Sequence, residues 1–109
     1  MRKKNIAIYG AGAIGLDLGV HLIEAEHRVS FIARGETKSA LASSGIIYES
    51  QEQQRIVEAN QFFCTDDTST LDFQDYVFLT TKSDDLLDIG KCLEPLIGRD
   101  TVVISATNG

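Results

Sequence analysis

Three glycines near the start of the chain constrain its fold more than any other feature. Gly10, Gly12 and Gly15 have the spacing Gly-x-Gly-x-x-Gly, and the run reads Gly10-Ala11-Gly12-Ala13-Ile14-Gly15. The segment 5–9 before this run is short, apolar and ended by a glycine, as a buried strand is. The segment 13–25 has apolar residues at every fourth position, which predicts a helix. A tight turn from strand to helix is therefore expected at the glycines.

The rest of the chain continues this alternation of strands and helices. Residues 28–33 predict a second strand, and a strand, helix, strand crossover of this length is parallel and right-handed. We then expect a helix over 36–44 stopped by Gly45, a two-strand hairpin within 45–60, a polar loop or connector over 62–74, a strand over 75–81, a helix capped by Ser83 that kinks or stops near Glu94, and a last strand over 101–105. The predicted fold class is α/β: a Rossmann-type, doubly wound, mostly parallel sheet flanked by helices and truncated after its fifth main strand.

Composition limits what such a domain can bind. A chain of 109 residues fits one domain, and a net charge of -6 without a basic patch argues against nucleic acid as a partner. The first apolar stretch is too short and too rich in glycine for a signal peptide or a membrane span, so we expect a cytoplasmic protein. No spacing of metal ligands occurs, and Cys64, Cys92, His21 and His27 are interpreted as structural residues.

Each glycine of the run has a separate task in a dinucleotide-binding site. The first permits the tight turn, the second lets a pyrophosphate approach the backbone, and the third lets the helix pack on the sheet. The amides at the start of the helix then face the anion. We therefore expect residues 10–15 to hold a dinucleotide; the alternative is a glycine-rich turn without a ligand.

The end of the second strand indicates which dinucleotide fits, because it lies beside the adenosine ribose. An acidic residue there would bind the ribose 2′-hydroxyl and repel a 2′-phosphate. This sequence has Arg34 at that place and no carboxylate before Glu36. A guanidinium makes bidentate, charge-assisted contacts to phosphate, so NADP is the predicted cofactor. The alternative is a solvated surface arginine.

Two further residues follow predicted strands at the edge of the sheet where ligands bind in open α/β folds. Lys82 comes after the strand over 75–81, and we expect it to contact the cofactor. Asn108 comes after the last strand, where its amide could bond the nicotinamide end or a substrate oxygen. The alternatives are an exposed lysine and a turn asparagine.

Taken together, these residues resemble the amino-terminal part of the ketopantoate reductase (2-dehydropantoate 2-reductase) family. Segments 10–15, 27–35, 81–83 and 101–109 carry the resemblance in this order, and it spans nearly the whole chain. The resemblance implies reduction of 2-dehydropantoate, a 2-keto acid, to pantoate by NADPH, a step toward pantothenate and coenzyme A.

The family also implies roles for single residues. The arginine that matches Arg34 meets the 2′-phosphate, the lysine that matches Lys82 contacts the cofactor, and the asparagine that matches Asn108 lies near nicotinamide and substrate. The family's proton-donating lysine and most substrate contacts belong to a carboxyl-terminal helical domain that this sequence lacks. Residues 1–109 are therefore expected to be an NADP-binding domain without catalytic residues, inactive alone. Asp17 departs from the family pattern and would weaken phosphate binding if it faced the loop.

Two other functions remain compatible with the sequence. One is a nucleotide-sensing regulatory Rossmann domain, in which the ligand changes the state of assembly. The other is a different NADP-dependent 2-hydroxyacid dehydrogenase. Because the last strand lacks what normally follows it, an exposed strand edge and apolar surface also predict self-association into a homo-oligomer.

Overall fold

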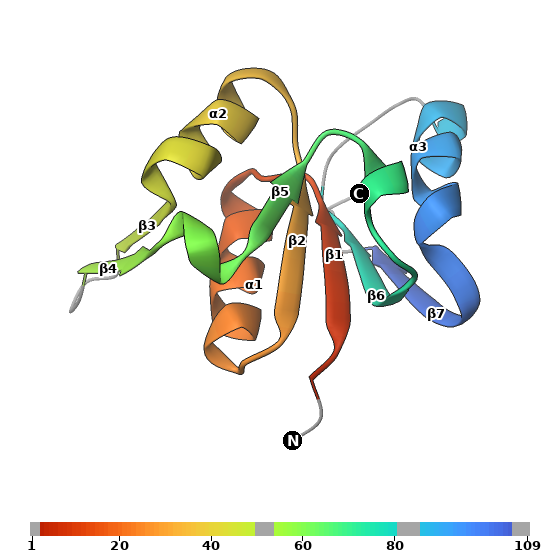
Figure 1. Ribbon diagram of the computed structural model, residues 1–109, viewed down its shortest axis with the longest axis horizontal. Coiled ribbons are helices and arrows are strands. Elements are labelled where there is room, and N and C mark those ends of the chain that lie inside the picture. The colour runs from red at the N-terminus through yellow and green to blue at the C-terminus, as the bar shows by residue number, and fades with distance from the viewer. Residues whose placement is uncertain (1–2, 50–53, 81–85, 106–109) are drawn as a thin grey trace.

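Five parallel strands form the main sheet of the protein. The computed structural model describes residues 3–49, 54–80 and 86–105 (Figure 1). The strand order is β5-β2-β1-β6-β7, and every pairing in the sheet is parallel. The bounds are β1 (Asn5–Tyr9), β2 (Arg28–Ile32), β5 (Phe63–Thr65), β6 (Gln74–Leu79) and β7 (Ile97–Ser105). The predicted α/β class with a parallel sheet is confirmed.

Helices cover the two faces of this sheet. Neighbouring residues of a strand point to opposite faces, and in β1 the buried pair Ala7 and Ile8 belongs to two separate apolar clusters. Ile8 packs in the cluster with residues of α1 (Ala13–Glu24) and α2 (Gly35–Ser44). Ala7 packs in the cluster with Leu93 of α3 (Leu86–Leu93) and Leu96 of the 3₁₀ turn η3 (Glu94–Leu96). Figure 1 shows α3 on the opposite side of the molecule from α1 and α2.

Close packing of α1 on β2 depends on a glycine in the helix. A Cβ atom on Gly19 would overlap the ring of Phe31, which is fully buried. Helix α2 ends where predicted, at Gly45, which has φ 71° and so adopts the left-handed backbone that glycine tolerates. A Cβ atom on Gly45 would also overlap the carbonyl oxygen of Val57.

The predicted hairpin within 45–60 is present as a separate two-stranded sheet. Strand β3 (Ile46–Glu49) pairs antiparallel with β4 (Gln54–Val57), and Ile46 stands opposite Val57. Both of these residues are buried in the cluster around Ile8. The hairpin therefore extends the core beside α2 rather than the main sheet.

The prediction of a loop or connector over residues 62–74 was wrong in part. Phe63–Thr65 form β5, the edge strand that pairs with β2, and the 3₁₀ turns η1 (Ala59–Gln61) and η2 (Thr68–Thr70) flank it. Three residues are too few to show a periodic pattern, so the pairing itself makes this segment a strand. Strand β7 also begins at Ile97, earlier than predicted, with an irregular register opposite Gln74. The predicted cap Ser83 lies outside the described residues.

Candidate functional site

The turn between β1 and α1 is fixed by backbone bonds to both neighbouring strands. Gly10 has φ 113°, a conformation open to glycine but not to other residues, and its N–H donates to the carbonyl of Ile32 at 3.1 Å. On the other side, the N–H and the hydroxyl of Thr80 each donate to the carbonyl of Tyr9 at 3.1 Å. The turn is therefore anchored at the carboxyl ends of β1, β2 and β6.

The second and third glycines of the run differ in what surrounds them. A Cβ atom on Gly15 would lie 2.6 Å from the carbonyl oxygen of Gly10 and 2.8 Å from the hydroxyl of Thr80. Gly15 is therefore required by the packing of the helix against the turn. A Cβ atom on Gly12 would meet no described atom within 4 Å, and its φ of -80° suits any residue. The described part of the protein gives no internal reason for a glycine at position 12.

Gly12 is also the N-cap of α1. Its carbonyl accepts the first helical bond, from the N–H of Leu16 at 2.9 Å, and no side chain caps the helix. The first amides of a helix have no partner within it, and they carry the positive end of the helix dipole. An anion placed beside Gly12 would meet these amides.

A cavity of about 650 Å³ opens in front of this turn. Its lining residues come from the ends of β1, β2 and β5, the start of α2 and the end of α3: Tyr9, Gly10, Ala11, Gly12, Ile32, Ala33, Arg34, Thr37, Asp66 and Cys92. Arg34 is the N-cap of α2, but its side chain makes no capping bond. The guanidinium lies beside the Tyr9 hydroxyl in the lining of the cavity.

The cavity is lined by side chains of both positive and negative charge. Burial raises the pKa of the Tyr9 hydroxyl; the Cys92 thiol adds to this and the positive charge of Arg34 opposes it. Asp66 brings a carboxylate to the cavity, and Lys38 Nζ lies 3.3 Å from its Oδ1. Lys38 therefore offsets a negative charge that would otherwise stand alone in the site.

The structure brings together four of the residues predicted to hold the cofactor. Gly10, Ala11, Gly12 and Arg34 line the cavity. The other members of the run, Ala13, Ile14 and Gly15, belong to α1 and do not line it; Gly15 packs on the turn instead. Lys82 and Asn108 lie outside the described residues.

Six residues of the cavity were not predicted to hold the cofactor, and two of them, Ile32 and Ala33, lie at the end of β2 directly before Arg34. Tyr9 directly precedes the first glycine, and Thr37 lies three residues after Arg34 on the same helix, so both could have been found by spacing. Asp66 follows β5, the strand that was missed. Cys92 was interpreted as a small buried residue, but it is half-buried and lines the cavity. Both cysteines are free thiols, and burial raises the pKa of Cys64.

Other residues that the sequence raised lie away from the site. Asp17 is not among the lining residues; its carboxylate lies 3.8 Å from His21 Nδ1, and its carbonyl lies 2.8 Å from the same atom. His27 Nδ1 accepts a bond from the N–H of Lys4 at 3.1 Å, at the other end of the sheet. Over the described ranges no three His, Cys, Asp or Glu residues gather as metal ligands, and no helix is long and apolar enough to span a membrane.

Comparisons with known proteins agree on one family. A sequence profile described as "Ketopantoate reductase PanE/ApbA" matches residues 6–109. A 2-dehydropantoate 2-reductase of Mesorhizobium japonicum is 34% identical over 107 residues, which is 95% of this chain and 31% of the relative. The crystal structure of a PanE/ApbA family ketopantoate reductase from Ralstonia eutropha has 31% identity and a TM-score of 0.82, over 95% of this chain and 34% of the other. D-mandelate dehydrogenase, solved as a ternary complex with NADH and anilino(oxo)acetate, has 25% identity and a TM-score of 0.79, over 95% and 33%. The chain thus spans about a third of each relative.

Proposed function

Because this chain belongs to the ketopantoate reductase family, we propose that it binds NADPH and forms the nucleotide-binding domain of an enzyme that reduces 2-dehydropantoate to pantoate. Pantoate is then used to make pantothenate and coenzyme A. When bound, NADPH would supply the hydride for the keto carbon, and the keto oxygen would take up a proton. The residues of this chain hold and orient the cofactor, and we assign none of them a catalytic role.

The observation that carries the proposal is the open space at Gly12. Neither backbone strain nor packing requires a glycine there, whereas Gly10 and Gly15 are both explained by the turn itself. A glycine that the protein does not need for its own structure leaves room for a ligand to reach the backbone. A diphosphate in that room would accept bonds from the uncapped amides of α1.

Preference for NADPH over NADH rests on Arg34, with support from Lys38. Arg34 lines the cavity beside the end of β2, where the adenosine ribose lies in sheets of this kind. Asp66, which follows β5 and lines the same cavity, would repel a 2′-phosphate, but its ion pair with Lys38 reduces that repulsion. We propose that the guanidinium binds the 2′-phosphate while the ion pair closes the adenosine end of the cavity.

Titration calorimetry of the chain with NADPH and with NADH tests this proposal. We expect tighter binding of NADPH, and Arg34→Ala should weaken NADPH by roughly 1 to 3 kcal/mol, the scale of hydrogen bonds to charged groups, with little effect on NADH. Arg99→Ala removes an exposed arginine of β7 outside the cavity and serves as the matched control. Equal affinity for both cofactors would contradict the role of Arg34, and binding of neither would contradict the proposal as a whole.

A second candidate is a 2-hydroxyacid dehydrogenase that acts on another 2-keto acid. The similarity to D-mandelate dehydrogenase, solved with NADH and a 2-oxo acid analogue, is the observation that favours it. The complete protein, assayed with 2-dehydropantoate, benzoylformate and other 2-keto acids, would separate the two. A higher kcat/KM for another keto acid, or for NADH, would replace the first proposal by the second.

A further inference from the structure

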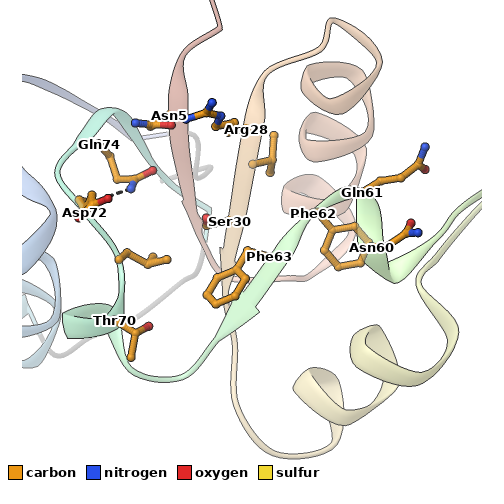
Figure 2. A pocket seen from close by; sticks show the side chains of 12 residues that line it. Asn5, Arg28, Ser30, Asn60, Gln61, Phe62, Phe63, Thr70, Asp72 and Gln74 are labelled. Carbon is orange, nitrogen blue, oxygen red and sulfur yellow. Dashed lines mark hydrogen bonds between the residues drawn. The ribbon is translucent and has the colours of Figure 1, made fainter.

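A second cavity, of about 440 Å³, lies at the opposite edge of the sheet from the glycine turn (Figure 2). Asn5 and Arg28, the first residues of β1 and β2, stand on its rim. Ser30 and Phe63, which are paired in the register of β2 and β5, form its floor. The segment that leads from η2 into β6 supplies another wall. The family resemblance assigns no role to this cavity, and the proposed cofactor site does not include it.

The feature that points to a ligand is the side chain of Gln74. It is only 6% exposed, and its Nε2 donates to the carbonyl of Asp72 at 2.8 Å. Because that carbonyl can only accept, the contact fixes which end of the amide is the oxygen. Gln74 Oε1 has no hydrogen-bond partner in the described part of the chain, and Figure 2 shows it turned away from Asp72. An acceptor left unpaired in the interior is costly, so this oxygen calls for a donor from outside the protein.

Arg28 places a positive charge at the same cavity, and this charge requires an anion. Its side chain is exposed, and it makes no hydrogen bond or ion pair with another described residue. A guanidinium in this setting favours a carboxylate, which it can bind through two parallel bonds. Asp72 lies beside Gln74 on the wall of the cavity, so the negative charge and the unpaired acceptor are neighbours.

An apolar surface separates these polar groups. Phe63 is 52% exposed although it lies on the sheet, and Leu71 lines the cavity beside it. Phe62, by contrast, is already used by the core, because its ring packs edge to face on Phe31 with centroids 5.4 Å apart. Figure 2 shows the ring of Phe63 between the β2 side of the cavity and the Thr70 wall. A ligand here would therefore carry an apolar part as well as its two polar ends.

We propose that this cavity binds a free α-amino acid. The carboxylate would pair with Arg28, the ammonium group would donate to Gln74 Oε1 beside Asp72, and the side chain would lie against Phe63 and Leu71. This chemistry satisfies the unpaired acceptor and the unpaired cation with one small molecule. The inference is independent of the proposed cofactor site, because the two cavities share no lining residue.

The chain should be titrated by calorimetry with each of the common α-amino acids. At least one is expected to bind at millimolar concentration or below. Its deaminated and decarboxylated analogues, such as isovalerate and isobutylamine in place of valine, should bind at least tenfold more weakly, since each lacks one polar end. Binding of no amino acid, or equal binding of the carboxylate-only analogue, would overturn the proposal.

Variants locate the binding within this cavity. Arg28→Ala and Gln74→Met should each decrease the affinity for the amino acid by about tenfold or more. The control variants Arg99→Ala and Gln54→Met change exposed residues elsewhere and should leave this affinity unchanged. Arg28 is exposed, so its replacement tests the proposal even if Gln74→Met unfolds the chain. NADPH affinity should be unchanged in Arg28→Ala, which separates failure of this site from failure of the cofactor site. Full amino acid affinity in Arg28→Ala, or a crystal soaked with the amino acid in which only water meets Gln74, would refute it.

Discussion

Replacing Gly12 by alanine tests separately whether folding and whether ligand binding requires a glycine at this position. The added methyl would meet no described atom within 4 Å, and the extended backbone at Gly12, with φ -80° and ψ -171°, suits alanine. Alanine is a poorer N-cap than glycine, which lowers stability. It also reduces the conformational entropy of the unfolded chain, which raises stability by roughly 0.4 to 1 kcal/mol. These effects oppose each other, so the free energy of unfolding should change by less than about 1 kcal/mol.

The same methyl should strongly decrease the affinity of the chain for NADPH. It would occupy the space through which a diphosphate approaches the uncapped amides of α1, and hydrogen bonds to charged groups contribute roughly 1.5 to 3 kcal/mol each. Loss of one such bond corresponds to a decrease in affinity of about ten- to more than a hundredfold. Calorimetry with NADPH and urea unfolding, both on Gly12→Ala, measure the two quantities separately.

Two other glycines provide the controls. Gly90 in α3 also has open space around it, so Gly90→Ala should raise the free energy of unfolding by about 0.5 to 1 kcal/mol and leave NADPH binding unchanged. Gly15→Ala would press a methyl to 2.6 Å from a backbone oxygen and should lower stability by about 1 to 3 kcal/mol. If Gly12→Ala binds NADPH like the unmodified chain, or unfolds like Gly15→Ala, the reasoning is wrong.

Two further predictions concern charge and assembly. Lys38→Ala leaves Asp66 without its cation, so NADPH should bind about two- to fivefold more weakly at low salt while NADH binding, compared by the same titration, changes less; an equal loss for both cofactors would contradict this. We also propose that the chain self-associates through β7, an edge strand whose Val102 and Val103 are 47% and 45% exposed. Light scattering should show oligomers that Val103→Lys reduces, and a strict monomer at high concentration would oppose this prediction.

The sequence predicted best the elements that carry their own local signal. The strand β1, the turn and α1 follow from a bounded apolar run, the glycines and a four-residue repeat, and each of these features lies within one short segment. Strand β5 was missed because its three residues become a strand only by pairing with β2, more than thirty residues earlier. Local pattern cannot reveal a strand that is created by its neighbour.

The same limit affected the reading of the cofactor site. The end of the second predicted strand has Arg34 and no carboxylate before Glu36, which favours NADP, yet the fold brings Asp66 to the same cavity from the end of β5. No local pattern pairs Lys38 with Asp66, because the two residues are 28 positions apart. We therefore propose that cofactor preference in this chain depends on a balance of three charges, of which the sequence alone indicates only that of Arg34.

The geometry of a parallel sheet explains why one cavity was visible in the sequence and the other was not. Parallel pairing brings the carboxyl ends of β1 and β2 together at Gly10 and Arg34, and it brings their amino ends together at Asn5 and Arg28. At the carboxyl ends the chain turns sharply into a helix, and that turn requires glycine at positions 10 and 15. At the amino ends no turn geometry restricts the residue types, so a cavity can form there without leaving a motif. Only the fold reveals it, through an amide oxygen of Gln74 that the described protein leaves unpaired.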